Sequence, residues 1–284
     1  MPVSVDPIRA IDFAGTPVAA TTAFTASDAS FCNAASKAYG GTNTITYAEA
    51  GVSDANHQTV ARYAEASARY IKAKLALDQS AEGFGDDVVI SVCAKNGGSK
   101  DGNGSGFYNS LEVNANYADD DIPFDQPGDG LKRLVLHEMI HVSHARLARC
   151  QSDGPAYGIT AKWFSEGSAL LLSGQDQYYT GDLPDYRKMA PANPYTWIEN
   201  GFPQFERYPI YRLAIESLVL ENGHQIDDVW SFTKAYFAQN NQCNSNGYRS
   251  FNQSISDYFG VDLTQGAWVK NFWTHTLDKY ALDE

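Results

Sequence analysis

The run from Leu131 to Leu147, LKRLVLHEMIHVSHARL, constrains this chain more than any other part of the sequence. It predicts one continuous helix, and it carries the pattern H-E-x-x-H at His137, Glu138 and His141. Residues four apart lie one above the other on the same face of a helix, so the two imidazoles can bind a single metal ion. Glu138 lies about 100° round the helix from His137, which keeps it out of this stack but within reach of a metal-bound water.

Two solvated histidines on a surface helix are the simplest alternative explanation of this pattern. The flanking residues argue against it, because they are apolar and predict a largely buried helix: Leu134, Val135, Leu136, Met139, Ile140 and Val142. Buried His and Glu side chains need partners, since moving a polar group out of water is costly. Two histidines with an adjacent carboxylate form the arrangement that a zinc hydrolase needs.

A second segment, Trp163 to Leu172, predicts another apolar helix and places Glu166 near its start. Twenty-four residues separate His141 from Glu166, which is enough for the first helix to end and for a second helix to return across it. A lone glutamate at a helix start is often favoured only by the helix dipole. In an apolar helix, however, a buried carboxylate requires a cation, so Glu166 is a candidate third ligand.

The two motifs together, H-E-x-x-H and W-x-x-E-G-x-A, resemble those of the gluzincin metallopeptidases, which include the thermolysin and aminopeptidase N branches. The resemblance implies that His137, His141 and Glu166 bind one zinc ion per chain and that Glu138 is the general base. It also implies a zincin-like fold, with a small N-terminal sheet, an active-site helix and a mostly helical C-terminal lobe.

Two other kinds of zinc site fit the sequence less well. The metzincin pattern requires a glycine and a third histidine where this chain has His144 and Leu147. His144 lies nearly two turns from His137, so we expect it to support a ligand or to face solvent. A structural zinc site is usually built from cysteines, and the four cysteines of this chain form no C-x-x-C pair.

Zinc held by two His and one Glu keeps a fourth position for water, whose pKa falls towards about 7. Glu138 would accept a proton from this water during attack on a carbonyl carbon and pass it to the leaving amine. The oxyanion then needs a further donor, which in gluzincins is commonly a Tyr or His of a later helix. We expect Tyr208 in this role, with Tyr211 and His224 as alternatives; either tyrosine could equally be a core aromatic.

The order of the predicted elements favours an α+β fold, since strands come first and helices last. We expect a helix over 54–79 with Asp54 as N-cap, strands over Asp87–Cys93 and Phe107–Tyr117, and helices near 204–222, 226–240, 247–259 and 264–281. Residues 1–45 would form an N-terminal arm, and 46–284 a single catalytic domain whose sheet-containing lobe ends near 150. By the gluzincin resemblance, the strand from Phe107 would be the sheet edge that pairs with an extended peptide.

Calcium is a secondary candidate cofactor. Residues Asp101 to Glu112 place oxygen-bearing residues, a glycine and a final glutamate as in a twelve-residue calcium loop. The flanks read as strands rather than helices, so a Gly-rich hairpin explains the same residues. The acidic run Asp119–Asp121, with Asp125 and Asp129, is a weaker candidate and reads equally as a solvated loop.

Charge and cysteine content narrow the compartment and the partners. The net charge of −13 argues against nucleic acid and anionic membranes as partners. Four widely spaced cysteines favour two disulfides and secretion; of the three pairings, Cys32–Cys93 and Cys150–Cys243 are preferred, whereas four free thiols would indicate a cytosolic enzyme. The first residues lack a signal-peptide pattern, so a secreted protein would have this sequence as its mature form. No stretch is long and apolar enough for a transmembrane helix.

The expected function is therefore that of a secreted, monomeric zinc peptidase acting on peptides or proteins, either as an endopeptidase or as an exopeptidase. An inactive relative that serves as a binding module is one alternative, and a zinc hydrolase of a non-peptide amide is another. The aromatic-rich segment from Gly174 to Gln204 could line a substrate cleft, or its rings could pack on the helical lobe.

Overall fold

The computed structural model describes residues 11–21, 32–33, 37–75, 89–97, 104–119, 130–148, 162–175, 211–212, 214–219, 223–239 and 247–261. The chain divides into two compact units. The N-terminal unit consists of Ser4–Ala156 with Leu172–Gln175, and the C-terminal unit of Tyr157–Leu171 and Asp176–Glu284 with Met1–Val3. The boundary between the units falls within one helix, α4 (Lys162–Ser173).

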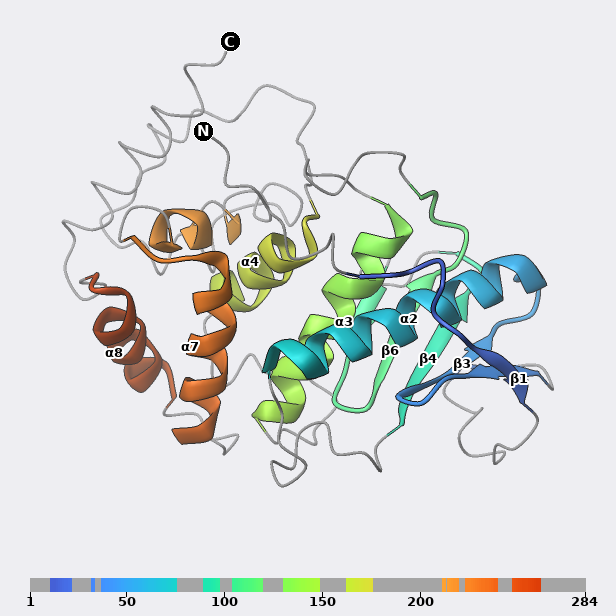
Figure 1. The fold of residues 1–284 in the computed structure, drawn as a ribbon, viewed down its shortest axis with the longest axis horizontal. Coiled ribbons are helices and arrows are strands. Elements are labelled where there is room, and N and C mark those ends of the chain that lie inside the picture. The colour runs from blue at the N-terminus through green and yellow to red at the C-terminus, as the bar shows by residue number, and fades with distance from the viewer. Residues whose placement is uncertain are drawn as a thin grey trace, which may run out of the picture. The chain divides into compact units, whose positions relative to one another are not determined.

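A mixed six-stranded sheet forms the framework of the N-terminal unit (Figure 1). The strands lie in the order β1-β2-β3-β4-β6-β5, where β3–β4 and β4–β6 are parallel pairs and the other pairs are antiparallel. Their bounds are Ala19–Thr21, Ala38–Gly40, Thr44–Ala48, Ile90–Lys95, Gly104–Gly106 and Ser110–Asn114 for β1 to β6. Sheet and helices together confirm the predicted α+β class. Strands β1 and β2 come from within the predicted N-terminal arm and extend this sheet.

Two helices of the N-terminal unit pack against the sheet. Helix α2 (Asp54–Leu75) contacts β2, β3 and β4, while α3 (Leu131–Leu147) contacts β5, β6 and α2. Side chains alternate between the faces of a strand, so residues paired across strands share a face. Between β4 and β6, the pairs in which both residues are buried are Val92 with Leu111 and Ala94 with Val113.

A disulfide between Cys32 and Cys93 belongs to a second small core, which also contains Ala38, Tyr47 and part of Ile45. Cys93 alternates with Val92 and Ala94 along β4, so this core lies on the other face of the sheet. The pairing confirms one of the two predicted disulfides, and the predicted Cys150–Cys243 pair lies outside the described residues. The bridge joins residues 61 apart in sequence. Closing this loop lowers the conformational entropy of the unfolded chain and so stabilises the folded state by about 4 kcal/mol.

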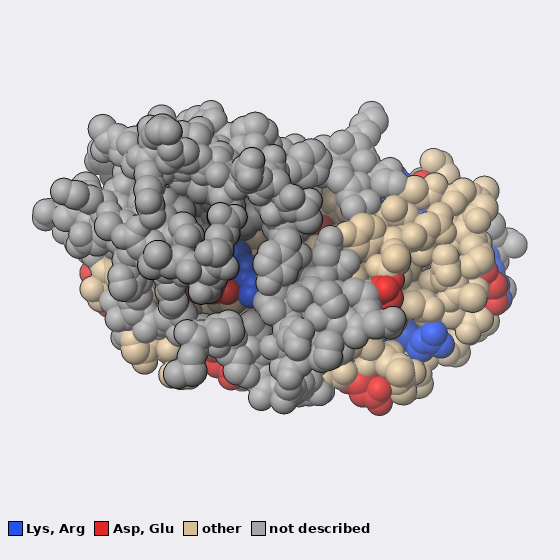
Figure 2. Space-filling view, turned by 90° about the horizontal axis from the view of Figure 1, so that it is seen from above, with Lys and Arg blue, Asp and Glu red and all other residues tan. Residues whose placement is uncertain are grey.

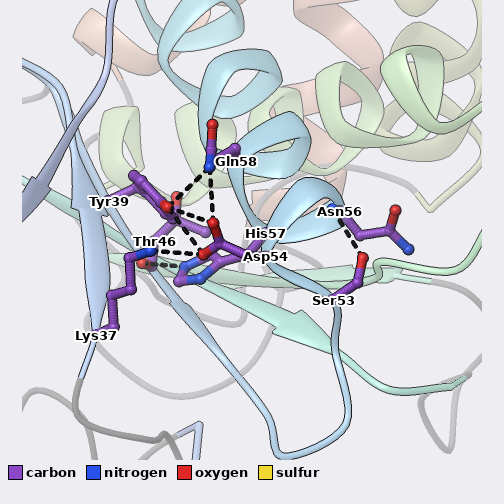
Figure 3. A network of polar contacts seen from close by, with 8 residues as sticks. All are labelled: Lys37, Tyr39, Thr46, Ser53, Asp54, Asn56, His57 and Gln58. Atoms are coloured by element: carbon purple, nitrogen blue, oxygen red, sulfur yellow. Dashed lines mark hydrogen bonds and ion pairs between the residues drawn. The ribbon is translucent and has the colours of Figure 1, made fainter.

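The start of α2 differs by one residue from the prediction. Ser53 is the N-cap, because its hydroxyl accepts the backbone N–H of Asn56, and Asp54 is the first helical residue. Asp54 instead accepts hydrogen bonds from Lys37 Nζ at 2.7 Å and Tyr39 Oη at 2.9 Å, both from the strand side (Figure 3). These hydrogen bonds lower the pKa of Asp54 to about 2, the one from Lys37 most. The network fastens the first turn of α2 to β2.

The predicted edge strand is wrong. Strand β6 contains the middle of the segment predicted from Phe107, but it lies between β4 and β5 within the sheet. The strand at that end of the described sheet is β5, whose residues Gly104–Gly106 pair antiparallel with Leu111–Val113 of β6. A Gly-Ser-Gly sequence lacks the β-branched and aromatic residues that mark a strand, which is why sequence reasoning assigned it to a connection.

The C-terminal unit is helical in its described part. Helices α7 (Ile226–Gln239) and α8 (Gly247–Phe259) agree with the predicted bounds, and residues 211–212 and 214–219 are helical as well. Its core is aromatic: the ring of Phe164 on α4 contacts the rings of Phe232 and Phe251 at 5.3 and 5.2 Å between centroids. The helix predicted near 264–281 and most of the aromatic segment from Gly174 to Gln204 lie outside the described residues.

Acidic residues lie apart from one another on the described surface that is visible in Figure 2, rather than in one continuous patch. Among the described helices, none is long and apolar enough to cross a membrane.

Candidate metal centre

Helix α3 begins at Leu131, as predicted, but its N-terminus is capped from a distant segment. Gly130 provides no side-chain cap, and the first turn contains no acidic residue. The carboxylate of Asp119 accepts the backbone N–H of Lys132 at 3.2 Å and also accepts the hydroxyl of Tyr63 on α2. Asp119, one of the weak calcium candidates, therefore stabilises the helix that carries the H-E-x-x-H motif.

The two motif histidines converge on one point. Both are buried, at 5% exposure for His137 and 8% for His141, and their Nε2 atoms are 3.0 Å apart. Two nitrogens at about 2.05 Å from a tetrahedral zinc ion would be about 3.3 Å apart. The spacing of the two rings therefore fits a shared metal ion with only a small adjustment.

Glu166 completes a group of three possible ligands. One oxygen of its carboxylate and one nitrogen of each histidine all lie within 4.8 Å of one another. The Glu166 side chain is buried, at 3% exposure, on the apolar helix α4. A buried carboxylate facing two imidazoles is stabilised by a cation, so the donor set and its burial fit a divalent metal ion such as zinc.

Glu138 lies beside this group and is also buried, at 6% exposure. It is not one of the three grouped residues, as its position on the helix predicts. Strand β5 passes directly over it: a Cβ built on Gly104 would lie 2.8 Å from Glu138 Oε1, and one on Gly106 only 2.4 Å from the Glu138 carbonyl oxygen. The sheet therefore approaches the candidate base through residues that have no side chain.

His144 is buried, at 1% exposure, so the predicted solvent-facing alternative is wrong. Its ring centroid is 6.3 Å from that of His141, in an edge-on contact. It does not belong to the ligand group found among the described residues. A contact with a ligand side chain agrees with the predicted supporting role.

Tyr208, the expected donor for the oxyanion, lies outside the described residues. Tyr211 is buried, at 1% exposure, and its carbonyl oxygen would be 2.2 Å from a Cβ built on Gly167. The backbone at Tyr211 therefore meets α4 directly after Glu166, and only glycine at position 167 permits this approach. His224, the third candidate, contacts Asp228 at 3.3 Å and the rings of Tyr258 and Phe259.

Sequence reasoning missed Arg146, which holds the connection between β5 and β6. Its Nη1 donates to Asn109 Oδ1 at 2.9 Å, and its guanidinium lies over the ring of Tyr108 at 5.5 Å. Arg146 is 2% exposed, and burial lowers the pKa of its guanidinium. Nothing in the local sequence distinguishes this arginine from a solvated one at a helix end.

Most residues that match the calcium-loop template lie in the hairpin formed by β5 and β6. Ser105 and Glu112, the fifth and last positions of the template, are cross-strand partners in β5 and β6. The carboxylate of Glu112 pairs with Lys95 Nζ at 3.2 Å. Ser105 Oγ donates to the carbonyl oxygen of Gly104, and Asn109 Oδ1 accepts from Arg146. Residues 101–103 of the template lie outside the described part.

Comparisons of this chain with models of known families, with curated proteins and with solved structures found no match. The gluzincin resemblance therefore depends on the two motifs alone. The geometry of His137, His141 and Glu166 is an independent observation, and it supports a metal ion without identifying the element.

Proposed function

We propose that this protein is a zinc-dependent peptidase of the gluzincin type. The observation that carries the proposal is the buried convergence of His137, His141 and Glu166, which come from two separate helices. These helices, α3 and α4, carry the two motifs by which the sequence resembles gluzincins. Zinc is the proposed metal because two imidazoles and one carboxylate match its ligand preference in catalytic sites.

In the proposed reaction, His137, His141 and Glu166 would hold the metal ion. A bound zinc ion would act as a Lewis acid and lower the pKa of a water molecule towards about 7. Glu138 orients this water, accepts its proton as the carbonyl carbon is attacked, and passes the proton to the leaving amine. The buried surroundings of Glu138 exclude bulk water and strengthen these interactions. Tyr208 is proposed as the oxyanion donor, with the buried Tyr211 as the alternative.

The proposed substrate is an extended peptide segment. Strand β5 is the end strand of the described sheet and lies against Glu138 and His141. A peptide added to its outer edge would form main-chain hydrogen bonds with β5 and would bring a scissile carbonyl near the metal centre. The proposal replaces the strand from Phe107 with β5 as the substrate-binding edge.

Secretion as a monomer is part of the same proposal. The Cys32–Cys93 bridge supports it, because disulfides persist mainly in oxidising compartments. The competing proposals are an inactive binding module that retains the metal ligands and a hydrolase of a non-peptide amide. Assays with casein and with non-peptide amides separate these three functions.

The decisive experiment combines metal analysis with a variant of the base. Purified wild-type protein should contain one zinc ion per chain, and a chelator should abolish casein hydrolysis. Glu138→Gln should retain zinc but lose at least about 100-fold in kcat, because it removes the proton acceptor. Asp257→Asn, which removes an exposed carboxylate on α8, is the control and should keep wild-type activity.

Each outcome bears on a different part of the proposal. Less than stoichiometric zinc with no other divalent ion would contradict the metal centre. Wild-type activity in Glu138→Gln would contradict its role as base. A zinc-loaded wild-type protein that hydrolyses neither casein nor non-peptide amides would favour the binding module, and hydrolysis of non-peptide amides alone would favour the amide hydrolase.

A further inference from the structure

Arg133 is a buried arginine one helical turn before His137 on α3. Its side chain is 1% exposed, and its Nη1 donates a hydrogen bond to the carbonyl oxygen of Gly174 at 2.7 Å. Gly174 directly follows α4 and has a φ of +63°, the left-handed conformation that ends many helices. The arginine of one ligand-bearing helix is therefore bonded to the end of the other.

This contact is stronger than an ordinary hydrogen bond. The C-terminal carbonyls of a helix carry partial negative charge, and α4 contains no basic residue in its own last turn. A guanidinium donates a short, charge-assisted bond to such a carbonyl, and its burial reduces screening by water. Arg133 thus supplies from α3 the cation that the end of α4 lacks.

The two contacts between these segments, Arg133 with Gly174 and His141 with Glu166, are separated by the same number of residues on each segment. On α3, Arg133 precedes His141 by eight residues, and Glu166 on α4 precedes Gly174, the residue that follows α4, by eight residues as well. Eight residues span about 12 Å of an α-helix. One end of this stretch of α4 is fixed by Arg133, and the other end presents Glu166 to the histidines.

We propose that Arg133 is a positioning residue that sets the axial register of α4 and thereby brings the Glu166 carboxylate to the metal. Because α4 is rigid, a shift of its C-terminal end along the axis moves Glu166 by a similar distance. Such a shift would leave the two histidines of α3 in place and would weaken only the carboxylate ligand. This inference rests on the proposed metal centre and goes beyond it by assigning a residue outside both motifs.

A double-mutant cycle tests the proposal, with Zn²⁺ affinity measured by competition against a chromophoric chelator. Arg133→Met removes the donors and keeps the apolar stem, and we expect it to weaken zinc binding by about 10- to 100-fold. Glu166→Ala should weaken binding at least as much. The double variant should bind no more weakly than Glu166→Ala alone, because Arg133 acts through Glu166.

Arg146→Met is the matched control, since Arg146 is also a buried arginine of α3 but bonds to Asn109 of the β5–β6 connection. Any effect of Arg146→Met on zinc affinity should persist unchanged in the Glu166→Ala background. If the arginine substitutions weakened zinc binding only by destabilising the fold, the effect of each would add to that of Glu166→Ala. If Arg133 positions Glu166, the effect of Arg146→Met adds to that of Glu166→Ala and the effect of Arg133→Met does not.

Visible spectra of the Co²⁺-substituted proteins provide a second readout. The spectrum of Arg133→Met should shift towards that of Glu166→Ala, because both lose the carboxylate ligand. Arg133→Lys, which keeps the charge but not the planar fork, should lie between wild type and Arg133→Met and replaces it if Arg133→Met does not fold. Far-UV circular dichroism checks folding in each case.

Two results would overturn the proposal: additive effects of Arg133→Met and Glu166→Ala, or a wild-type Co²⁺ spectrum in Arg133→Met. Either could occur while wild-type protein binds zinc and hydrolyses peptides, and the proposed function would then stand. Absence of Zn²⁺ and Co²⁺ binding by wild type would instead refute the metal centre and this inference together.

Discussion

Glu65 on α2 is a fully buried carboxylate that holds the turn between β2 and β3. It accepts the backbone N–H groups of Thr42, Asn43 and Thr44 at 2.9–3.1 Å, and Arg69 Nε donates to it at 2.9 Å. Side-chain donors of Asn43 and Thr44 add two further bonds. The negative charge is thus fully compensated without solvent.

We predict that Glu65→Gln destabilises the fold by about 3 kcal/mol, because an amide places donors against donors and leaves Arg69 without its carboxylate. Urea denaturation monitored by circular dichroism measures the change. Asp54→Asn, which alters an exposed carboxylate of the same helix, should have a much smaller effect. Equal effects of the two substitutions would contradict this account of Glu65.

At the residue scale, the candidate ligands could be predicted and the residues that support them could not. His137, His141 and Glu166 are marked by their chemical type and by helical spacing, which are local properties of the sequence. Arg133, Asp119 and Glu65 bond to segments 41, 13 and 21 to 23 residues away. Their roles depend on which segments become neighbours, and no local pattern contains that information.

Strand β5 and helix α3 approach each other more closely than side chains would allow. A Cβ on Gly106 would lie 2.4 Å from the Glu138 carbonyl oxygen and 2.8 Å from His141 Cβ. Neither atom belongs to the flexible end of a side chain, so the clash could be relieved only by moving the strand or the helix. Glycine at this position is therefore a requirement of the interface between the sheet and the metal-binding helix.

We predict that Gly106→Ala destabilises the protein by about 1–3 kcal/mol and lowers both zinc affinity and peptidase activity, since β5 must move away from α3. Gly40→Ala is the matched control in strand β2, where the new methyl group would meet only Thr21 Cγ2 at 3.6 Å. Urea denaturation and zinc titration of both variants measure the difference. A Gly106→Ala protein that equals Gly40→Ala in both measurements would refute the close contact.

Elements with strong periodicity were predicted well, and the strand that meets the site was not. The bounds of α3 agree with the prediction at both ends, and those of α4 within one residue, because long apolar helices carry a repeated signal. Strand β5 consists of Gly104, Ser105 and Gly106, which have little intrinsic preference for extended structure. Its strand conformation comes from pairing with β6, which is a tertiary interaction.

The N-terminal unit contains a buried histidine outside the candidate metal centre, His57, which makes the unfolding free energy depend on pH. His57 on α2 donates from Nε2 to the carbonyl oxygen of Thr46 on β3 at 2.7 Å, and its ring lies edge-on against Tyr39 (Figure 3). Burial lowers its pKa from the ordinary value of 6.5, against a smaller opposing effect of the Thr46 carbonyl. Asp54 and Lys37 also face it, and their charges act in opposite directions.

The sign of the pH effect follows from this lowered pKa. Folded His57 stays neutral below pH 6.5, whereas unfolded His57 takes up a proton, so acid favours the unfolded state. We predict that the unfolding free energy falls as the pH drops below about 6.5, with a contribution from His57 of at most about 1.4 kcal/mol per pH unit until its folded pKa is reached.

Urea denaturation between pH 8 and 5 tests this prediction, with a chelator present so that metal binding adds no pH dependence. His57→Gln keeps an amide donor for the Thr46 carbonyl but does not titrate. Its unfolding free energy should fall less steeply than that of wild type over the same range. Parallel curves for the two proteins would show that His57 does not contribute.

Across the whole molecule, the amino-acid sequence predicts the α+β class, the helices that carry the two motifs and the three candidate ligands. Each of these follows from residue type and periodicity, which act over one or two turns of chain. Three further features emerge only in the folded molecule: β5 is the end strand of the described sheet, Gly106 is required beside His141, and Arg133 bonds to the carbonyl oxygen that follows α4. These features depend on contacts between segments distant in sequence, whose geometry is fixed only when the sheet and the helices pack together.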